Sequence, residues 1–190
     1  MLRFLKAVLF LSLVALIGSC GSQSKNLVEP EWPYGAKFIY KESAVRLHIT
    51  ADPRLNLYEG EPRTLHLCIY QLRNPNTINQ MANNLDGLYQ LLDQNCGFTD
   101  GSVAGSKALT IYPGEQNTYV LDRAEGAKYV VIVAGYFSLE GDSITRLVRV
   151  PVIFVKKKAG LFKTVEIAQP DLLDIYLTLG PRQIQKMEAK

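Results

Sequence analysis

Apolar and polar residues alternate along much of the chain, and this period of two restricts the fold more than any other feature. Val45, Leu47 and Ile49 alternate with polar residues, and Leu65, Leu67 and Ile69 repeat the pattern. This alternation predicts strands that bury one face. The segment 129–137 is apolar at nearly every position, which predicts a central strand covered on both faces. Seven or eight such strands predict a mainly β protein, a two-sheet β-sandwich.

One segment departs from the strand period. Between Asn76 and Asn95, apolar residues fall at helical spacing, at Leu85, Leu88, Tyr89 and Leu92. This predicts one short amphipathic helix inserted between strands and packed on the sandwich. The last ten residues, 181–190, are mostly polar, and we expect a frayed tail there.

The N-terminus has the features of a signal peptide. Arg3 and Lys6 precede an apolar run of 11 residues, Ala7 to Ile17, which is too short for the roughly 20 residues that span a bilayer. The sequence Ile-Gly-Ser-Cys that ends at Cys20 resembles the lipobox of bacterial lipoproteins, whose cysteine is acylated and becomes the new N-terminus. Acyl chains on Cys20 anchor a protein in a lipid bilayer. An ordinary secretory signal followed by a chance cysteine is the alternative.

These features predict four regions: a signal peptide over 1–19, a lipidated N-terminus and tether over 20–42, the β-sandwich over 43–180, and the tail. Apart from Cys20, the chain has only Cys68 and Cys96. In an oxidising compartment they could form a disulfide, and two unbridged thiols are the alternative.

Composition excludes several classes of function. Residues 20–190 carry 19 basic and 18 acidic side chains, so no strong charge points to nucleic acid. No Ser/His/acid or Cys/His set is evident, so we expect no enzymatic activity, no cofactor and no metal. His48 and His66, predicted on strands of one sheet, could form a metal site, but two solvent-facing histidines fit better. Lys156, Lys157 and Lys158 could touch anionic headgroups, but a solvated hairpin tip is the simpler interpretation.

One connection is unusually long. Twelve residues separate the first two predicted strands, whereas a hairpin loop has two to five. Apolar and aromatic side chains on a long loop indicate a protein-binding tip, unless the leucines fold back on the sandwich. The predicted partner-binding loop consists of Asp52, Pro53, Arg54, Leu55, Asn56, Leu57, Tyr58, Glu59, Gly60, Glu61, Pro62 and Arg63.

The series of segments resembles the TssJ family, the outer-membrane lipoproteins of type VI secretion. The resemblance rests on the lipobox, ADPRLNLYEGEPRTL, the strand ending at Leu72, the helical DGLYQLL, the DGSVA loop, YPGE and DRAEGAKYVVIVAGYF. It covers about residues 43–180 and implies a transthyretin-like sandwich without catalytic activity.

The resemblance also implies a location and a partner. Family members sit on the inner leaflet of the outer membrane, facing the periplasm, and bind the periplasmic C-terminal domain of the inner-membrane protein TssM. The binding loop of the family joins the first two strands, which corresponds here to Asp52–Arg63. The alternative function is a periplasmic lipoprotein that binds a small ligand or a cell-wall glycan.

Overall fold

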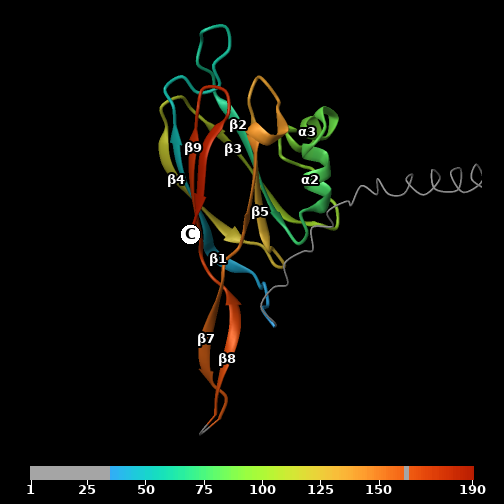
Figure 1. The fold of residues 1–190 in the computed structure, drawn as a ribbon, viewed down its shortest axis with the longest axis vertical. Coiled ribbons are helices and arrows are strands. Elements are labelled where there is room, and N and C mark those ends of the chain that lie inside the picture. The colour runs from blue at the N-terminus through green and yellow to red at the C-terminus, as the bar shows by residue number, and fades with distance from the viewer. Residues whose placement is uncertain (1–34, 161–162) are drawn as a thin grey trace, which may run out of the picture. The chain divides into compact units, whose positions relative to one another are not determined.

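The structure, a computed structural model, describes residues 35–160 and 163–190 (Figure 1). Cys20 and the predicted signal peptide lie outside the described residues. None of the helices in the described part of the chain has the length and apolar character needed to cross a bilayer.

Two four-stranded sheets form the body of the protein. The first sheet has the order β10-β9-β1-β4, and the second has the order β3-β2-β5-β6. In the first sheet, β1 pairs in parallel with β9 and antiparallel with β4. The bounds of the first sheet's strands are Lys41–Ala51 (β1), Gln116–Arg123 (β4), Leu173–Leu179 (β9) and Ile184–Ala189 (β10). Those of the second are Leu65–Leu72 (β2), Val103–Ile111 (β3), Tyr129–Gly135 (β5) and Thr145–Arg149 (β6). The predicted sandwich is confirmed.

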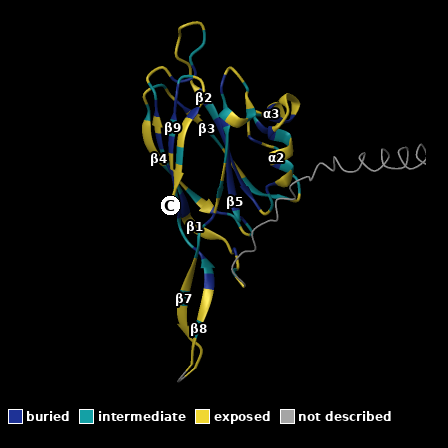
Figure 2. Ribbon diagram, in the orientation of Figure 1, coloured by how far each residue is buried: buried dark blue, intermediate teal, exposed yellow. Residues whose placement is uncertain are grey.

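The alternating residues of the strands supply the core between the sheets (Figure 2). Val45, Leu47 and Ile49 are at most 2% exposed, whereas the residues between them reach the surface or lie half-buried. The first six residues of β5 are buried on both faces, as its continuous apolar sequence predicts. The helical insertion lies against the second sheet (Figure 1), where the Tyr70 hydroxyl donates to the Leu91 carbonyl at 2.7 Å, and it covers the face turned away from the first sheet.

Two helices, rather than one, form the insertion. They are α2 (Asn76–Ala82) and α3 (Leu85–Leu91), and the side chain of Asn84 caps α3 by accepting a hydrogen bond from the backbone N–H of Gly87. The predicted apolar stripe is wrong in part, because Leu85 and Tyr89 are exposed while Leu88 and Leu91 are buried. The two helices approach closely at Gly87, where an added Cβ would overlap the Met81 carbonyl oxygen, so this side of α3 faces α2.

The C-terminal residues form a strand, so the predicted frayed tail is wrong. Ile184, 1% exposed, pairs with Leu179, and Met187 packs against the core as well. These two apolar residues are three apart, which places them on opposite faces of a regular strand. A register shift between Ile184 and Lys186 brings both toward the core. The sandwich therefore continues past residue 180 to Ala189.

A separate two-stranded hairpin belongs to neither main sheet. Among the described strands, β7 (Val152–Lys158) and β8 (Thr164–Pro170) pair with each other alone, and they extend away from the two sheets (Figure 1). The lysines 156–158 end β7, so they belong to a strand and lie beside the hairpin tip rather than forming it.

The two histidines are in different sheets, which corrects their predicted placement in one. His48 lies on β1 of the first sheet, and His66 lies on β2 of the second. His48 Nε2 is 2.9 Å from Asp174 Oδ1, and its ring stacks on Tyr176. The predicted sheet was wrong because the two strands are consecutive in sequence, yet the chain crosses between the sheets after β1.

Candidate partner-binding site

The loop Asp52–Arg63 is long because it crosses from one sheet to the other. It joins β1 to β2, so it does not close a hairpin. Asp52 fixes its start: its N–H donates to the Leu179 carbonyl at 2.8 Å, and its own carbonyl accepts from Gly114 N–H at 3.2 Å. The loop therefore begins from a position held by β9 and by the turn after β3.

Its first half is part of the core. Leu55 is 0% exposed, so its predicted place in a partner contact is wrong. It folds back on the sandwich, which was the alternative interpretation of the loop. Asn56, 8% exposed, holds two neighbouring segments. Its Nδ2 donates to the Thr64 carbonyl at 2.9 Å, and its Oδ1 accepts from the N–H of Phe137 at 2.9 Å. One side chain thus ties the loop to the segment that follows β5.

The second half projects as a tight turn. The backbone groups of Tyr58 and Glu61 exchange hydrogen bonds of 3.0 and 2.9 Å. Between them, Glu59 and Gly60 have φ of 52° and 84°, which is the pattern of a type I′ turn. The glycine suits this conformation because it has no Cβ. Side chains at the tip are therefore presented on a defined backbone.

An aromatic pair stands beside this turn. The rings of Tyr58 and Phe137 have centroids 3.6 Å apart and are tilted by 30°. Phe137 is 64% exposed, and the Arg63 guanidinium lies 5.2 Å from the centre of the Tyr58 ring. Phe137 is not among the predicted site residues. The predicted strand over 129–137 is two residues too long, because β5 ends at Gly135, and Phe137 lies in the segment after it rather than in a strand covered on both faces.

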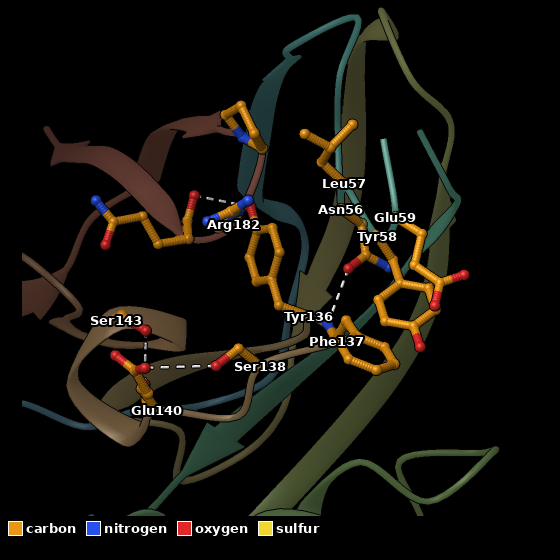
Figure 3. A pocket seen from close by; sticks show the side chains of 12 residues that line it. Asn56, Leu57, Tyr58, Glu59, Tyr136, Phe137, Ser138, Glu140, Ser143 and Arg182 are labelled. Carbon is orange, nitrogen blue, oxygen red and sulfur yellow. Dashed lines mark hydrogen bonds between the residues drawn. The ribbon is translucent and has the colours of Figure 1, made fainter. Parts of the chain in front are cut away.

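A groove of about 450 Å³ lies next to the pair (Figure 3). Its walls come from the loop, from the segment 136–143 and from residues 181–183. Leu57 N–H donates to the Pro181 carbonyl at 2.7 Å, which joins two of these walls. Tyr136 donates its hydroxyl to the Gln183 carbonyl at 2.9 Å, and burial raises the pKa of this phenol, which therefore stays neutral.

The chemistry of the groove suits recognition. Its lining mixes aromatic, amide and hydroxyl groups with the charges of Glu59, Glu140 and Arg182. Exposed charges of both signs surround the tip, at Arg54 and Glu61 among others. An apolar centre with a polar rim is the composition of a protein interface.

The two remaining predicted site residues lie elsewhere. Cys68 on β2 and Cys96 after α3 are joined by a disulfide, which ties the helical insertion to the second sheet. His66 Nε2 is 3.3 and 3.6 Å from the two sulfur atoms and donates to the Asp93 carbonyl at 3.0 Å. These three residues form a cluster of metal-ligand type, but sulfur atoms bonded to each other do not supply thiolates.

Comparison with known proteins places the fold. The solved structure of the type VI secretion lipoprotein TssJ1 from Pseudomonas aeruginosa is 18% identical, with a TM-score of 0.56; the match covers 78% of this chain and 97% of that chain. Lip of Serratia marcescens, a membrane-bound component of the type VI secretion system, is 18% identical with a TM-score of 0.54, covering 74% of this chain and 94% of that one. A structure described as the TssM C-terminal domain from EAEC is 16% identical with a TM-score of 0.52, covering 76% and 96%. These likenesses show a shared fold.

A search of curated proteins gave no match. The family model for the type VI secretion lipoproteins (VasD, EvfM, TssJ, VC_A0113) matches residues 43–159, which is more than half of the chain and includes both the crossing loop and Phe137. The chain belongs to the type VI secretion lipoprotein family.

Proposed function

We propose that this protein is a non-catalytic component of the type VI membrane complex, held at the inner leaflet of the outer membrane by acylated Cys20. Its sandwich faces the periplasm and binds the periplasmic C-terminal domain of the inner-membrane protein TssM. The family supports this proposal, as do similar structures described as a TssM C-terminal domain and as the type VI membrane complex.

The observation that carries the binding proposal is the Tyr58–Phe137 pair. Two loops from different strands place these rings together at the edge of a groove, and Asn56 holds the loops in place. Aromatic side chains dominate the energy of many protein interfaces. We therefore assign the contact to Leu57, Tyr58 and Phe137, with the charged residues of the tip steering association.

Binding to the periplasmic fragment of TssM from the same secretion system tests this assignment. Truncating an interface anchor costs about 2 kcal/mol or more, some thirtyfold in affinity. We expect Tyr58→Ala and Phe137→Ala each to weaken binding by at least this factor. Tyr89→Ala is the matched control, since Tyr89 is a 61% exposed aromatic on α3, away from the groove.

Thermal unfolding of each variant separates loss of contact from loss of fold. If Tyr58→Ala and Phe137→Ala both bind with wild-type affinity, the interface lies on another surface. Binding of a cell-wall glycan in the groove, without binding of TssM, would favour the alternative function.

The anchor has its own test. Cys20→Ser removes the thiol that would accept diacylglycerol, so we expect the variant to lose labelling by palmitate and to leave the outer-membrane fraction. A variant that is still labelled and still fractionates with the outer membrane would contradict the lipobox assignment.

A further inference from the structure

In the described part of the chain, most of the hairpin formed by β7 and β8 lies outside the core, and only its base is covered, where Val152 packs against the core and Ala168 is 5% exposed. Its strands pair with each other alone, so the outer edge of each strand is free of either main sheet. Its base is fixed, because Asp171 N–H donates to the Pro151 carbonyl and Arg123 Nη1 donates to the Asp171 carbonyl, both at 2.9 Å. A two-stranded hairpin is marginally stable in water by itself, so a surface that covers it would stabilise it.

Most side chains on one face of this hairpin are apolar. Val155 lies opposite Ile167, and the neighbouring pairs Ile153–Gln169 and Lys157–Val165 lie on the same face, so Lys157 borders this aliphatic surface. Ile153 and Ile167 are 39% and 37% exposed, and on the other face Phe154 is 63% exposed. This is a concentration of exposed apolar surface on an element that contributes little to the core.

Positive charge is concentrated on the same hairpin. Between Val152 and Pro170 there are four lysines and one glutamate, whereas the rest of residues 20–190 carries 15 basic and 17 acidic side chains. Glu166 lies 4.0 Å from Lys156, and no ion pair of the described residues includes Lys157, Lys158 or Lys163. The hairpin is therefore basic on an otherwise slightly acidic domain.

We propose that the β7–β8 hairpin binds an anionic phospholipid surface, with its lysines at the headgroups and its aliphatic face against the interface. Apolar area combined with lysines is the composition of segments that lie on membranes. Lysines also protect strand edges from pairing, but this role does not account for the uncovered isoleucines and Phe154. The contact is separate from the TssM site and needs neither Cys20 nor an acyl chain.

Vesicle sedimentation of a non-acylated chain that begins at residue 21 tests the proposal, since every described element lies within the compact unit Trp32–Lys190. We expect binding to vesicles of phosphatidylglycerol and phosphatidylcholine in equal amounts, weaker binding to phosphatidylcholine alone, and loss of binding at high salt. Each lysine near an anionic surface contributes about fivefold to partitioning, so Lys157→Gln with Lys158→Gln lowers it about thirtyfold.

The matched control removes two lysines elsewhere. Lys107→Gln with Lys186→Gln changes the net charge equally on β3 and β10, and we expect much less effect. Ile153→Thr with Ile167→Thr keeps the strand propensity and the charge, and its binding falls about tenfold if the aliphatic face meets the interface. Equal binding to both vesicle types, unchanged binding in the hairpin lysine variant, or capture by an acidic protein without any vesicle binding would overturn the proposal.

Discussion

Leu55 and Tyr58 are three residues apart in the crossing loop and have different roles. Leu55 is fully buried, whereas Tyr58 stacks on Phe137 at the groove. Leu55→Ala would leave a cavity in the core and is expected to lower the free energy of unfolding by about 2–5 kcal/mol. Urea unfolding measures this loss, and Arg54→Ala, an exposed neighbour, is the control. A Leu55→Ala protein as stable as wild type would show that this leucine is not part of the core.

Asp174 links stability to pH through two partners on β1. The bond from His48 Nε2 to its Oδ1 and the bond from Arg46 Nη2 to its Oδ2 hold the pKa of this carboxyl below its ordinary 3.8. A carboxyl with a lowered folded pKa stabilises the protein above the unfolded pKa, and this contribution is lost as pH falls through the folded pKa.

Asp174→Asn should therefore be less stable than wild type at neutral pH, by up to about 1 kcal/mol for a partly exposed pair. The difference in free energy of unfolding should shrink toward zero as the pH falls from the ordinary carboxyl pKa through the lower pKa of the folded state. Urea unfolding across this range measures it, with Asp86→Asn on α3 as the control of equal charge. A difference that stays constant with pH would assign the effect to something other than this carboxylate.

At the scale of elements, the disulfide secures the two helices to the second sheet. Closing the chain between Cys68 and Cys96 stabilises the fold by about 3.6 kcal/mol in the chain-entropy model. We expect Cys68→Ala with Cys96→Ala to lower the free energy of unfolding by about this amount. Counting thiols in the unfolded, unreduced protein is the independent check, and two reactive thiols would show that the bridge is absent.

Elements whose own sequence carries the burial pattern could be predicted. The alternation at Val45 to Ile49 and the apolar run of β5 indicate their burial directly, because each strand supplies its own periodicity. The strand β10 could not be recognised, since its two core residues share a face only through a bulge. The true buried face of α3 depends on the close contact of Gly87 with α2, which no local pattern encodes.

The loop of the candidate site could be predicted from its own sequence, but its contacts with other segments could not. The length and aromatic content of 52–63 indicated the loop, but its crossing between sheets depends on strand pairing far away in sequence. Phe137 joins Tyr58 only because Asn56 bonds the two segments across 81 positions of the chain. Such tertiary contacts leave no trace in residue spacing.

For the whole molecule, the last ten residues are expected to support the fold. A chain that ends at Gly180 loses β10 and with it the buried Ile184. We expect its free energy of unfolding to fall by at least about 2 kcal/mol, the loss typical of a large buried aliphatic side chain. Deleting only Lys190, whose backbone exchanges two hydrogen bonds with Asp174, measures the share of this loss that belongs to the last residue alone. Equal unfolding midpoints for the shortened and the full chain would show that residues 181–190 do not stabilise the fold, as expected of a frayed tail.

The central position of β1 in the first sheet has a consequence for how the protein acquires its structure. This strand ends at Ala51, whereas its parallel neighbour β9 begins only at Leu173 and is synthesised much later. Contacts between residues so distant in sequence form slowly, because a long loop must close before they contribute stability. The sheet therefore stays incomplete until β9 has been synthesised, and its apolar strands remain exposed to aggregation during that interval. Such a nascent protein depends on being shielded until β9 is available to pair with β1.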